Sequence, residues 1–244
     1  MAGEAFGFDD AVDAIAAESR LMSSAVASAD LDTRVPTTSL WSVRDLAHHI
    51  GTVQSYWAAN VRAKNPDERA GGPLAALPPD SDLLAWLGWC TYSLLRALRE
   101  AGPDSPCWAW WGEPTPHTAG AVARHQAQEV AVHRWDAQGS VGTTLPLPAQ
   151  LANDGVPEFI EVMVGPDVAA LRGGVTLRAV DTGGSWRVGR DTASAGTPPT
   201  GEAELNATAS DLVLMLYRRL PVPDADVDGD PMLVASLLSL ADTS

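Results

Sequence analysis

The feature that most constrains the fold is a series of four segments in the first 140 residues that have the pattern of helices. In the first two, apolar side chains recur every three or four positions. The third is strongly apolar, and the fourth contains no Pro and no Gly apart from Gly120. Stretches rich in Pro and Gly separate the second segment from the third and the third from the fourth. The segments are residues 9–29, a stretch that begins after Ser42, residues 83–98 and residues 117–138. This series predicts a bundle of four helices.

The second segment has the clearest start signal. Ser42 and Asp45 form the pattern of a capping box, in which each side chain accepts a hydrogen bond from the backbone of the other residue. Apolar side chains then follow at helical spacing at Leu46, Ile50, Val53 and Trp57. We therefore expect a helix with one buried face. The third segment follows the acidic residues 80–82, which we expect to cap it.

The second half of the chain has a different pattern. Two alternating runs, residues 174–181 and 185–190, flank the turn sequence Thr-Gly-Gly and predict a β-hairpin. Residues 203–208 are a third candidate strand, and three helices are expected at residues 149–163, 211–219 and 231–241. The chain is thus predicted to be an α+β protein, with a four-helix bundle over residues 1–145 and a small α+β domain over residues 146–244.

The charge balance excludes two kinds of partner. The chain has 31 acidic and 16 basic residues, a formal net charge of −15, so electrostatic repulsion opposes binding to nucleic acid or to an anionic membrane surface. The longest apolar stretch without charge, residues 83–95, is shorter than the roughly 20 residues that a membrane helix needs. No secretory signal is visible at the N-terminus, and we expect a cytoplasmic location.

Several common chemistries lack sequence support. The chain has no phosphate-binding glycine loop, no dinucleotide fingerprint and no serine nucleophile elbow. Its one lysine, Lys64, lies in a polar run and is a poor candidate for a Schiff base. Cys90 and Cys107 form neither a disulfide framework nor a zinc knuckle, and we interpret them as structural.

The five histidines are the most informative residues. On the second helix, His49 borders the apolar stripe, whereas His48 is expected to face water. On the fourth helix, Glu129 and His133 are four residues apart, so their side chains can reach one point near the helix surface. With His49 they make two imidazoles and one carboxylate, a set that leaves a catalytic zinc one open position.

Other interpretations of these residues remain open at this point. A Glu and a His four positions apart are often only an exposed helix pair, and a histidine beside an apolar face is often a hydrogen-bonded core residue. The fourth helix also has a competing apolar side, at Ala127, Ala131 and Trp135. His125 and Asp136 lie on the same stripe as Glu129, whereas Arg124 and Arg134 point the other way.

Two short segments carry a family resemblance. Residues 41–49 (WSVRDLAHH) and 129–137 (EVAVHRWDA) resemble the signature stretches of the maleylpyruvate isomerase family of mycothiol-dependent enzymes, which belong to the DinB-like metal-binding bundles. Residues 209–221 and 229–231 resemble the small C-terminal domain of that family, so nearly the whole chain is covered. The resemblance implies that His49, Glu129 and His133 bind a divalent metal, with zinc as the expected ion.

The resemblance also implies a chemistry. A zinc-bound thiol of mycothiol would be held as a thiolate that attacks a small electrophilic substrate, in an isomerase or in an S-transferase. Arg219 is the best match to a basic residue at the cleft, with Arg218 as the alternative; either is otherwise a surface arginine favoured by a helix C-terminus. A non-catalytic binding protein on the same bundle and a metal-dependent hydrolase that uses bound water are the competing hypotheses.

The remaining candidates have two interpretations each. Asp136 either orients a ligand imidazole or is a solvated carboxylate at a helix end. His125 is a further ligand, a proton shuttle or polar lining of the site. Trp111, in a cluster with Trp108 and Trp110, either lines the pocket for substrate and cofactor or packs in the core. The sequence indicates neither the substrate nor the oligomeric state.

Overall fold

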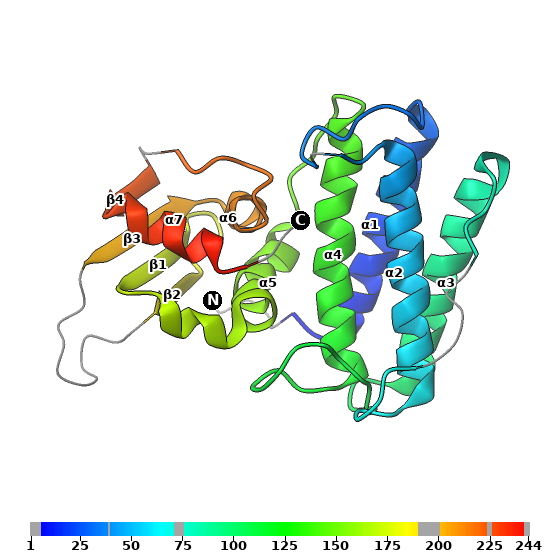
Figure 1. Cartoon of the computed structure of the whole chain (residues 1–244), viewed down its shortest axis with the longest axis horizontal. Coiled ribbons are helices and arrows are strands. Elements are labelled where there is room, and N and C mark those ends of the chain that lie inside the picture. Colours follow the sequence, from blue (N-terminus) through cyan, green and yellow to red (C-terminus); the bar gives the residue numbers. More distant parts are fainter. Residues whose placement is uncertain (1–5, 39, 71–75, 190–200, 224–225, 242–244) are drawn as a thin grey trace. The chain divides into compact units, whose positions relative to one another are not determined.

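The structure is a computed structural model that describes residues 6–38, 40–70, 76–189, 201–223 and 226–241. It divides into two compact units. One comprises Met1–Trp110 with Thr115–Leu145, and the other comprises Trp111–Pro114 with Pro146–Ser244. Together they make an α+β chain, as predicted, in which a helical unit precedes a unit built on a four-stranded sheet (Figure 1).

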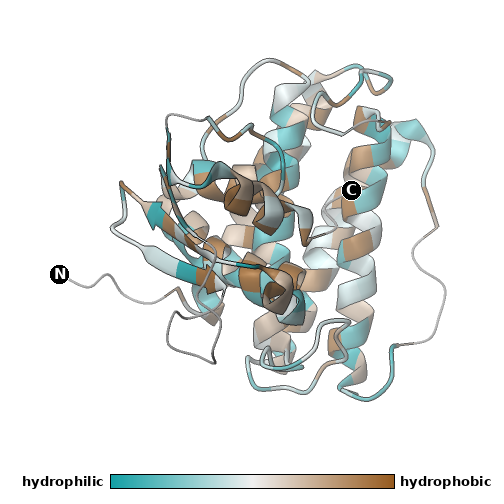
Figure 2. Cartoon of the chain, turned by 60° about the vertical axis from the view of Figure 1, so that its left-hand side comes forward, coloured by the Kyte–Doolittle hydropathy of each residue, from teal (hydrophilic) through white to brown (hydrophobic). Residues whose placement is uncertain are grey.

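The first unit is the predicted bundle of four long helices. They are α1 (Phe8–Ser28), α2 (Val43–Ala63), α3 (Leu83–Ala101) and α4 (Ala119–Gly139). Figure 2 shows hydrophilic and hydrophobic residues intermixed along the long helices, as expected of helices with one face in a core. The core side chains include Ile15, Met22, Leu46, Ile50, Leu87 and Leu94, all at most 1% exposed.

The helix starts follow the capping chemistry of the sequence at α2 but differ elsewhere. Ser42 Oγ accepts from the backbone N–H of Asp45, and the Asp45 carboxylate accepts from the Ser42 N–H, so the capping box is confirmed. Asp82 makes no side-chain cap, and Asp80–Asp82 form a 3₁₀ turn instead. α4 begins two residues later than expected because Thr118 caps it, through a bond from the Ala121 N–H.

Helix α4 packs against α1, α2 and α3. It is buried on more than one side, with Ala127 and Ala131 on one side and Val122 and His133 on another, so its sequence lacks a single apolar face. Polar residues of α4 are therefore placed in the interior, where each needs a hydrogen-bonding or ionic partner.

The second unit packs helices against a mixed sheet with strand order β2-β1-β3-β4. The elements are α5 (Ala149–Phe159), β1 (Gly174–Ala179), β2 (Ser185–Gly189), β3 (Glu202–Ala207), α6 (Ala209–Leu216), β4 (Val227–Gly229) and α7 (Pro231–Ser239). The predicted hairpin is confirmed, since β1 and β2 pair antiparallel, while β1 and β3 pair parallel. The α-helical part of the expected helix 149–163 ends at Phe159, and a π turn, Ile160–Val164, follows it.

Candidate metal site

Three side chains from two helices converge at one point of the bundle. His49 comes from α2, and Glu129 and His133 come from successive turns of α4. Each offers one ligand atom, and these atoms all lie within 4.8 Å of one another. Oε1 of Glu129 is 2.9 Å from Nε2 of His49 and 3.6 Å from Nε2 of His133. The helical spacing and the packing of α2 on α4 thus bring together the residues that the sequence analysis singled out.

The donor set fits a divalent cation. Zinc bonds of about 2.0–2.1 Å in a tetrahedron place neighbouring ligand atoms about 3.3 Å apart. The two distances from Glu129, 2.9 Å and 3.6 Å, lie on either side of that value. The longer one exceeds hydrogen-bonding length, so a shared cation would satisfy Nε2 of His133 and the carboxylate at the same time. Two imidazoles and one carboxylate could therefore hold a zinc ion with little rearrangement.

The electrostatics of the site keep the carboxylate ionised. Burial by itself would raise the pKa of the Glu129 carboxyl, but the charge of His133 and the hydrogen bond and charge of His49 act in the opposite direction. The net result is a Glu129 pKa far below its ordinary value. The ionised form is the one that binds a cation.

Asp136 lies directly behind one of the candidate ligands. Its Oδ2 is 2.9 Å from Nδ1 of His133, and its side chain is completely buried. Thr37, from the segment between α1 and α2, donates a hydrogen bond from its hydroxyl to Oδ1 of Asp136. The interpretation of Asp136 as a solvated helix-end residue is therefore wrong, because that segment covers the end of α4. The carboxylate is placed to orient the imidazole of His133.

Trp41 is a residue of the site that sequence reasoning missed. Its ring centroid lies 4.7 Å from that of His49 and 5.8 Å from that of His133. The two imidazoles are themselves 4.9 Å apart, in an edge-on arrangement. Two sequence signals could have pointed to Trp41: it stands immediately before the capping serine of α2, and it begins the stretch 41–49 that carries the family resemblance. Its ring therefore packs beside both candidate ligands.

The other two histidines of these helices lie outside the cluster. His125 is buried, with its ring 6.1 Å from that of Trp57 and 5.9 Å from that of Trp110. It is not among the described residues whose ligand atoms converge. His48 was expected to face water, but it is half-buried against Trp86 of α3. The helical wheel of α2 failed here because α3 covers the side of α2 away from the apolar stripe.

The three tryptophans of residues 108–111 have different surroundings, and the burial of Trp111 agrees with core packing, one of the two interpretations of its sequence. Trp111 is buried in the second unit, whereas Trp108 and Trp110 belong to the first, so the three do not form a cluster in one unit. Trp110 is half exposed, and Trp108 packs edge-on to Tyr56.

The two arginines after α6 differ from each other. α6 ends at Leu216, not at residue 219, and Arg218 has a left-handed backbone with φ of 58°. The guanidinium of Arg218 donates to the carbonyls of Leu238 and Ala241 at the end of α7. Arg219 donates from Nη1 to the Tyr217 carbonyl, 2.9 Å away, and is half-buried. Arg218 is thus engaged in the packing of the second unit.

The cysteines are buried thiols. Burial raises the pKa of Cys107 to about 12, and burial also raises that of Cys90, partly offset by a hydrogen bond from Ser55. Both thiols are therefore protonated at neutral pH and poor nucleophiles. This agrees with the structural role expected from the sequence.

The fold and the site define an α+β protein whose helical bundle carries a candidate centre for a divalent metal. The family model of the mycothiol maleylpyruvate isomerase N-terminal domain matches residues 12–138, just over half of the chain. The chain therefore belongs to this family, and its bundle is of the DinB-like type.

Comparison with solved structures supports the same fold. The crystal structure of the mycothiol-dependent maleylpyruvate isomerase and that of a histidine-to-alanine mutant of it are each 13% identical to this chain, with a TM-score of 0.60. Each match covers 94% of this chain and 96% of the other. At this identity the likeness shows the fold alone.

No curated protein matches. Among the described residues, no helix is both long and apolar enough to cross a membrane.

Proposed function

We propose that this protein is a metal-dependent enzyme that uses mycothiol to act on a small electrophilic substrate, as an isomerase or an S-transferase. The observation that carries the proposal is the convergence of His49, Glu129 and His133 within 4.8 Å. Membership of the mycothiol maleylpyruvate isomerase family supports the choice of mycothiol over other thiols.

Zinc is the proposed metal because two imidazoles and one carboxylate are typical of catalytic zinc sites that leave one position open. When bound, zinc lowers the pKa of a coordinating thiol and so supplies a thiolate at neutral pH. The protein contributes the orientation of the donors: Asp136 holds Nδ1 of His133, and Trp41 packs on both imidazoles.

The proposed reaction begins with attack of the mycothiol sulfur on an activated carbon of the substrate. In an isomerisation, a C–S bond forms, the alkene electron pair moves toward the neighbouring carbonyl, rotation occurs about the new single bond, and the C–S bond then breaks to return the thiol. In a transfer, the C–S bond persists, and the displaced electron pair either takes up a proton at the neighbouring carbon or departs with a leaving group. Neither route needs an oxidant or a reductant.

We propose Arg219 as the cation that neutralises a substrate carboxylate or the developing enolate. The choice over Arg218 rests on the bonds of Arg218 to the end of α7. His125, buried between the rings of Trp57 and Trp110, is proposed as a proton carrier or as polar lining of the site. Trp111 is proposed as a contact for the thiol cofactor. A cytoplasmic location is part of the proposal, since a thiol cofactor and two free cysteines suit a reducing compartment.

The experiment measures mycothiol binding by isothermal titration calorimetry to the zinc-loaded and the metal-stripped protein. It also measures turnover of maleylpyruvate with and without mycothiol. We expect binding only to the loaded protein and turnover only when the thiol is present. If mycothiol binds but maleylpyruvate is not converted, other electrophiles are screened for transfer. Zinc binding with no affinity for mycothiol would contradict the proposal and favour a hydrolase or a structural metal site.

A further inference from the structure

The segment between α1 and α2 reaches the candidate metal site at two points. Thr37 donates its hydroxyl hydrogen to Oδ1 of Asp136 at the end of α4. Trp41 packs its ring on His49 and His133. Two residues of one connecting segment therefore touch the candidate ligands or the carboxylate behind them.

Asp136 links Thr37 to the imidazole of His133, whose Nε2 is the proposed metal-binding nitrogen. Asp136 is fully buried, and its second oxygen, Oδ2, accepts from Nδ1 of His133 at 2.9 Å. A proton on Nδ1 leaves the lone pair on Nε2, the atom that faces Glu129. The hydroxyl of Thr37 holds the other oxygen of the same carboxylate and so resists its rotation. The series Thr37, Asp136, His133 thus defines both the tautomer and the ring orientation of one candidate ligand.

The position of Thr37 is itself defined by the fold. The backbone N–H of Thr38 bonds to the carbonyl of Val35, which closes a turn with Pro36 in its second position, where proline is favoured. Pro36 lies beside Gly139 at the end of α4, with its Cδ 3.9 Å from where a Cβ on that glycine would stand. The turn is therefore packed against the helix that carries Asp136.

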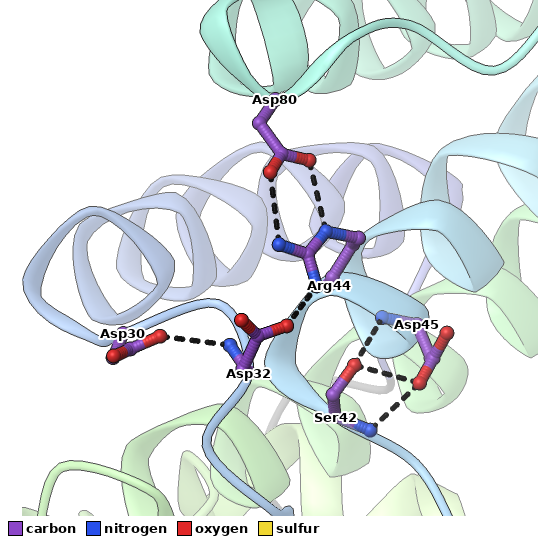
Figure 3. Close-up of polar contacts among 6 residues, drawn as sticks. All are labelled: Asp30, Asp32, Ser42, Arg44, Asp45 and Asp80. Atoms are coloured by element: carbon purple, nitrogen blue, oxygen red, sulfur yellow. Dashed lines mark hydrogen bonds and ion pairs between the residues drawn. The ribbon is translucent and has the colours of Figure 1, made fainter.

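An ion-pair cluster holds the start of the same segment. Figure 3 shows Arg44, in the first turn of α2, between Asp32 of the segment and Asp80 before α3. Its Nε and Nη2 each lie 2.8 Å from an oxygen of Asp80, a two-pronged contact. These hydrogen bonds raise the pKa of Arg44 above its ordinary value, and a guanidinium is in any case charged at neutral pH. The cluster joins the segment to α2 and to the 3₁₀ turn that precedes α3.

We propose that Thr37 is a positioning residue of the metal centre, which acts through Asp136 to hold His133 in the geometry and tautomer that bind the ion. This inference rests on the proposed function, since it assumes that His133 is a ligand. It assigns to the segment between α1 and α2 a role in metal affinity that the ligand set alone does not include.

The test measures the dissociation constant for Zn²⁺ by competition with a chromophoric chelator, in the full chain. Thr37→Val removes the hydroxyl at nearly constant shape, and Thr37→Ser keeps it. The matched control is Thr38→Val, because Oγ1 of Thr38 is buried without a hydrogen-bond partner in the described part of the chain. Circular dichroism and thermal unfolding of the metal-free variants establish that each is folded.

We expect Thr37→Val to weaken zinc binding about threefold to tenfold, somewhat less than the roughly 10- to 100-fold cost of losing a group bonded directly to a ligand. Thr37→Ser and Thr38→Val should bind as the wild type does. In an Asp136→Asn background, Thr37→Val should add little further loss, because the two residues act in series.

Three outcomes would overturn the proposal: unchanged affinity in Thr37→Val, an equal loss in Thr37→Ser, or the full loss of Thr37→Val retained in the Asp136→Asn background. A wild-type protein that binds no Zn²⁺ at all would instead contradict the proposed metal-dependent function. The two failures are therefore distinguishable in one series of titrations.

Discussion

Helix α4 carries two polar clusters on different faces, one fully buried and the other partly open to solvent. On one face Arg134 donates from Nε to Oε2 of Glu18 at 2.7 Å and from Nη1 to Oε1 of Gln138 at 2.8 Å. The side chains of Arg134 and Glu18 are 1% and 3% exposed. This cluster is a closed ion pair that joins α4 to α1, with the cation supplied by the protein.

In the other cluster, the carboxylate is paired with two imidazoles and not with an arginine. Glu129 is ionised and lies between His49 and His133, and neither contact is with a permanent cation. The side chains of His49 and Glu129 are 31% and 17% exposed, so solvent and a ligand can reach them. The comparison teaches that burial of a charged residue on α4 does not by itself indicate function. The candidate site differs because the groups that contact its carboxylate are imidazoles, which also bind metals.

The largest expected effect is a loss of zinc affinity when the carboxylate of the candidate metal site is replaced. Glu129→Gln should weaken zinc binding by more than the roughly 10- to 100-fold that loss of a group bonded to a ligand costs, because a charged ligand itself is lost. The free energy of unfolding of the metal-free protein should change little. Chelator competition and urea denaturation measure the two quantities. Zinc affinity equal to that of the wild type would remove Glu129 from the site.

The converse change should affect stability and spare the metal. Glu18→Gln leaves Arg134 buried beside a neutral partner, and breaking such a pair lowers the free energy of unfolding by about 3–5 kcal/mol. Zinc stoichiometry in the folded protein should stay the same. The matched control is Glu100→Gln in the exposed pair of Arg96 and Glu100, where little loss of stability is expected because solvent screens the charges. A larger effect in the control would contradict the contrast.

The contrast between the clusters also marks what the sequence could predict. The spacing of Glu129 and His133 and the apolar stripe of α2 made His49, Glu129 and His133 candidates, and the family resemblance favoured them as ligands; the structure brings the three together. The spacing and the stripe are local, periodic properties. The same patterns predicted the bundle and the hairpin, because their periods of 3.6 and 2 are visible in sequence.

What could not be predicted depends on packing between distant segments. Asp136 is buried because the turn at Thr37 covers the end of α4, 99 residues away in sequence. His48 is half-buried because Trp86 of α3 packs on it. Strand β4 has three residues, too few to show alternation, and it forms by pairing with β3. Each case is a tertiary contact with no periodic signal.

The two arginines after α6 give a third prediction. Arg219→Gln should lower mycothiol-dependent turnover by up to about 100-fold, as expected for loss of a group that stabilises developing negative charge. Zinc content should not change. Arg218→Gln should instead reduce thermal stability, because its bonds to the end of α7 are lost, with turnover retained. The reverse assignment of effects would show that Arg218 is the residue at the substrate.

The smallest expected functional effect is at the cysteines. Since burial raises the pKa of Cys107 to about 12, its thiolate is scarce at pH 8, and alkylation of the native protein should be slow compared with the urea-unfolded chain. Mass spectrometry of iodoacetamide-treated samples measures this. Cys107→Ala should retain zinc binding and turnover. Loss of turnover in this variant would indicate a second thiol in the chemistry and contradict a structural role.

The measurement that tests the central claim most directly is the metal content of the purified, untagged protein by elemental mass spectrometry, beside the His133→Ala variant. If the open cluster on α4 is a metal centre, we expect about one zinc per wild-type chain and a loss of that zinc in the folded variant. A folded wild-type protein that cannot be loaded with any divalent metal would contradict the account. Stoichiometric zinc retained in His133→Ala would place the metal elsewhere.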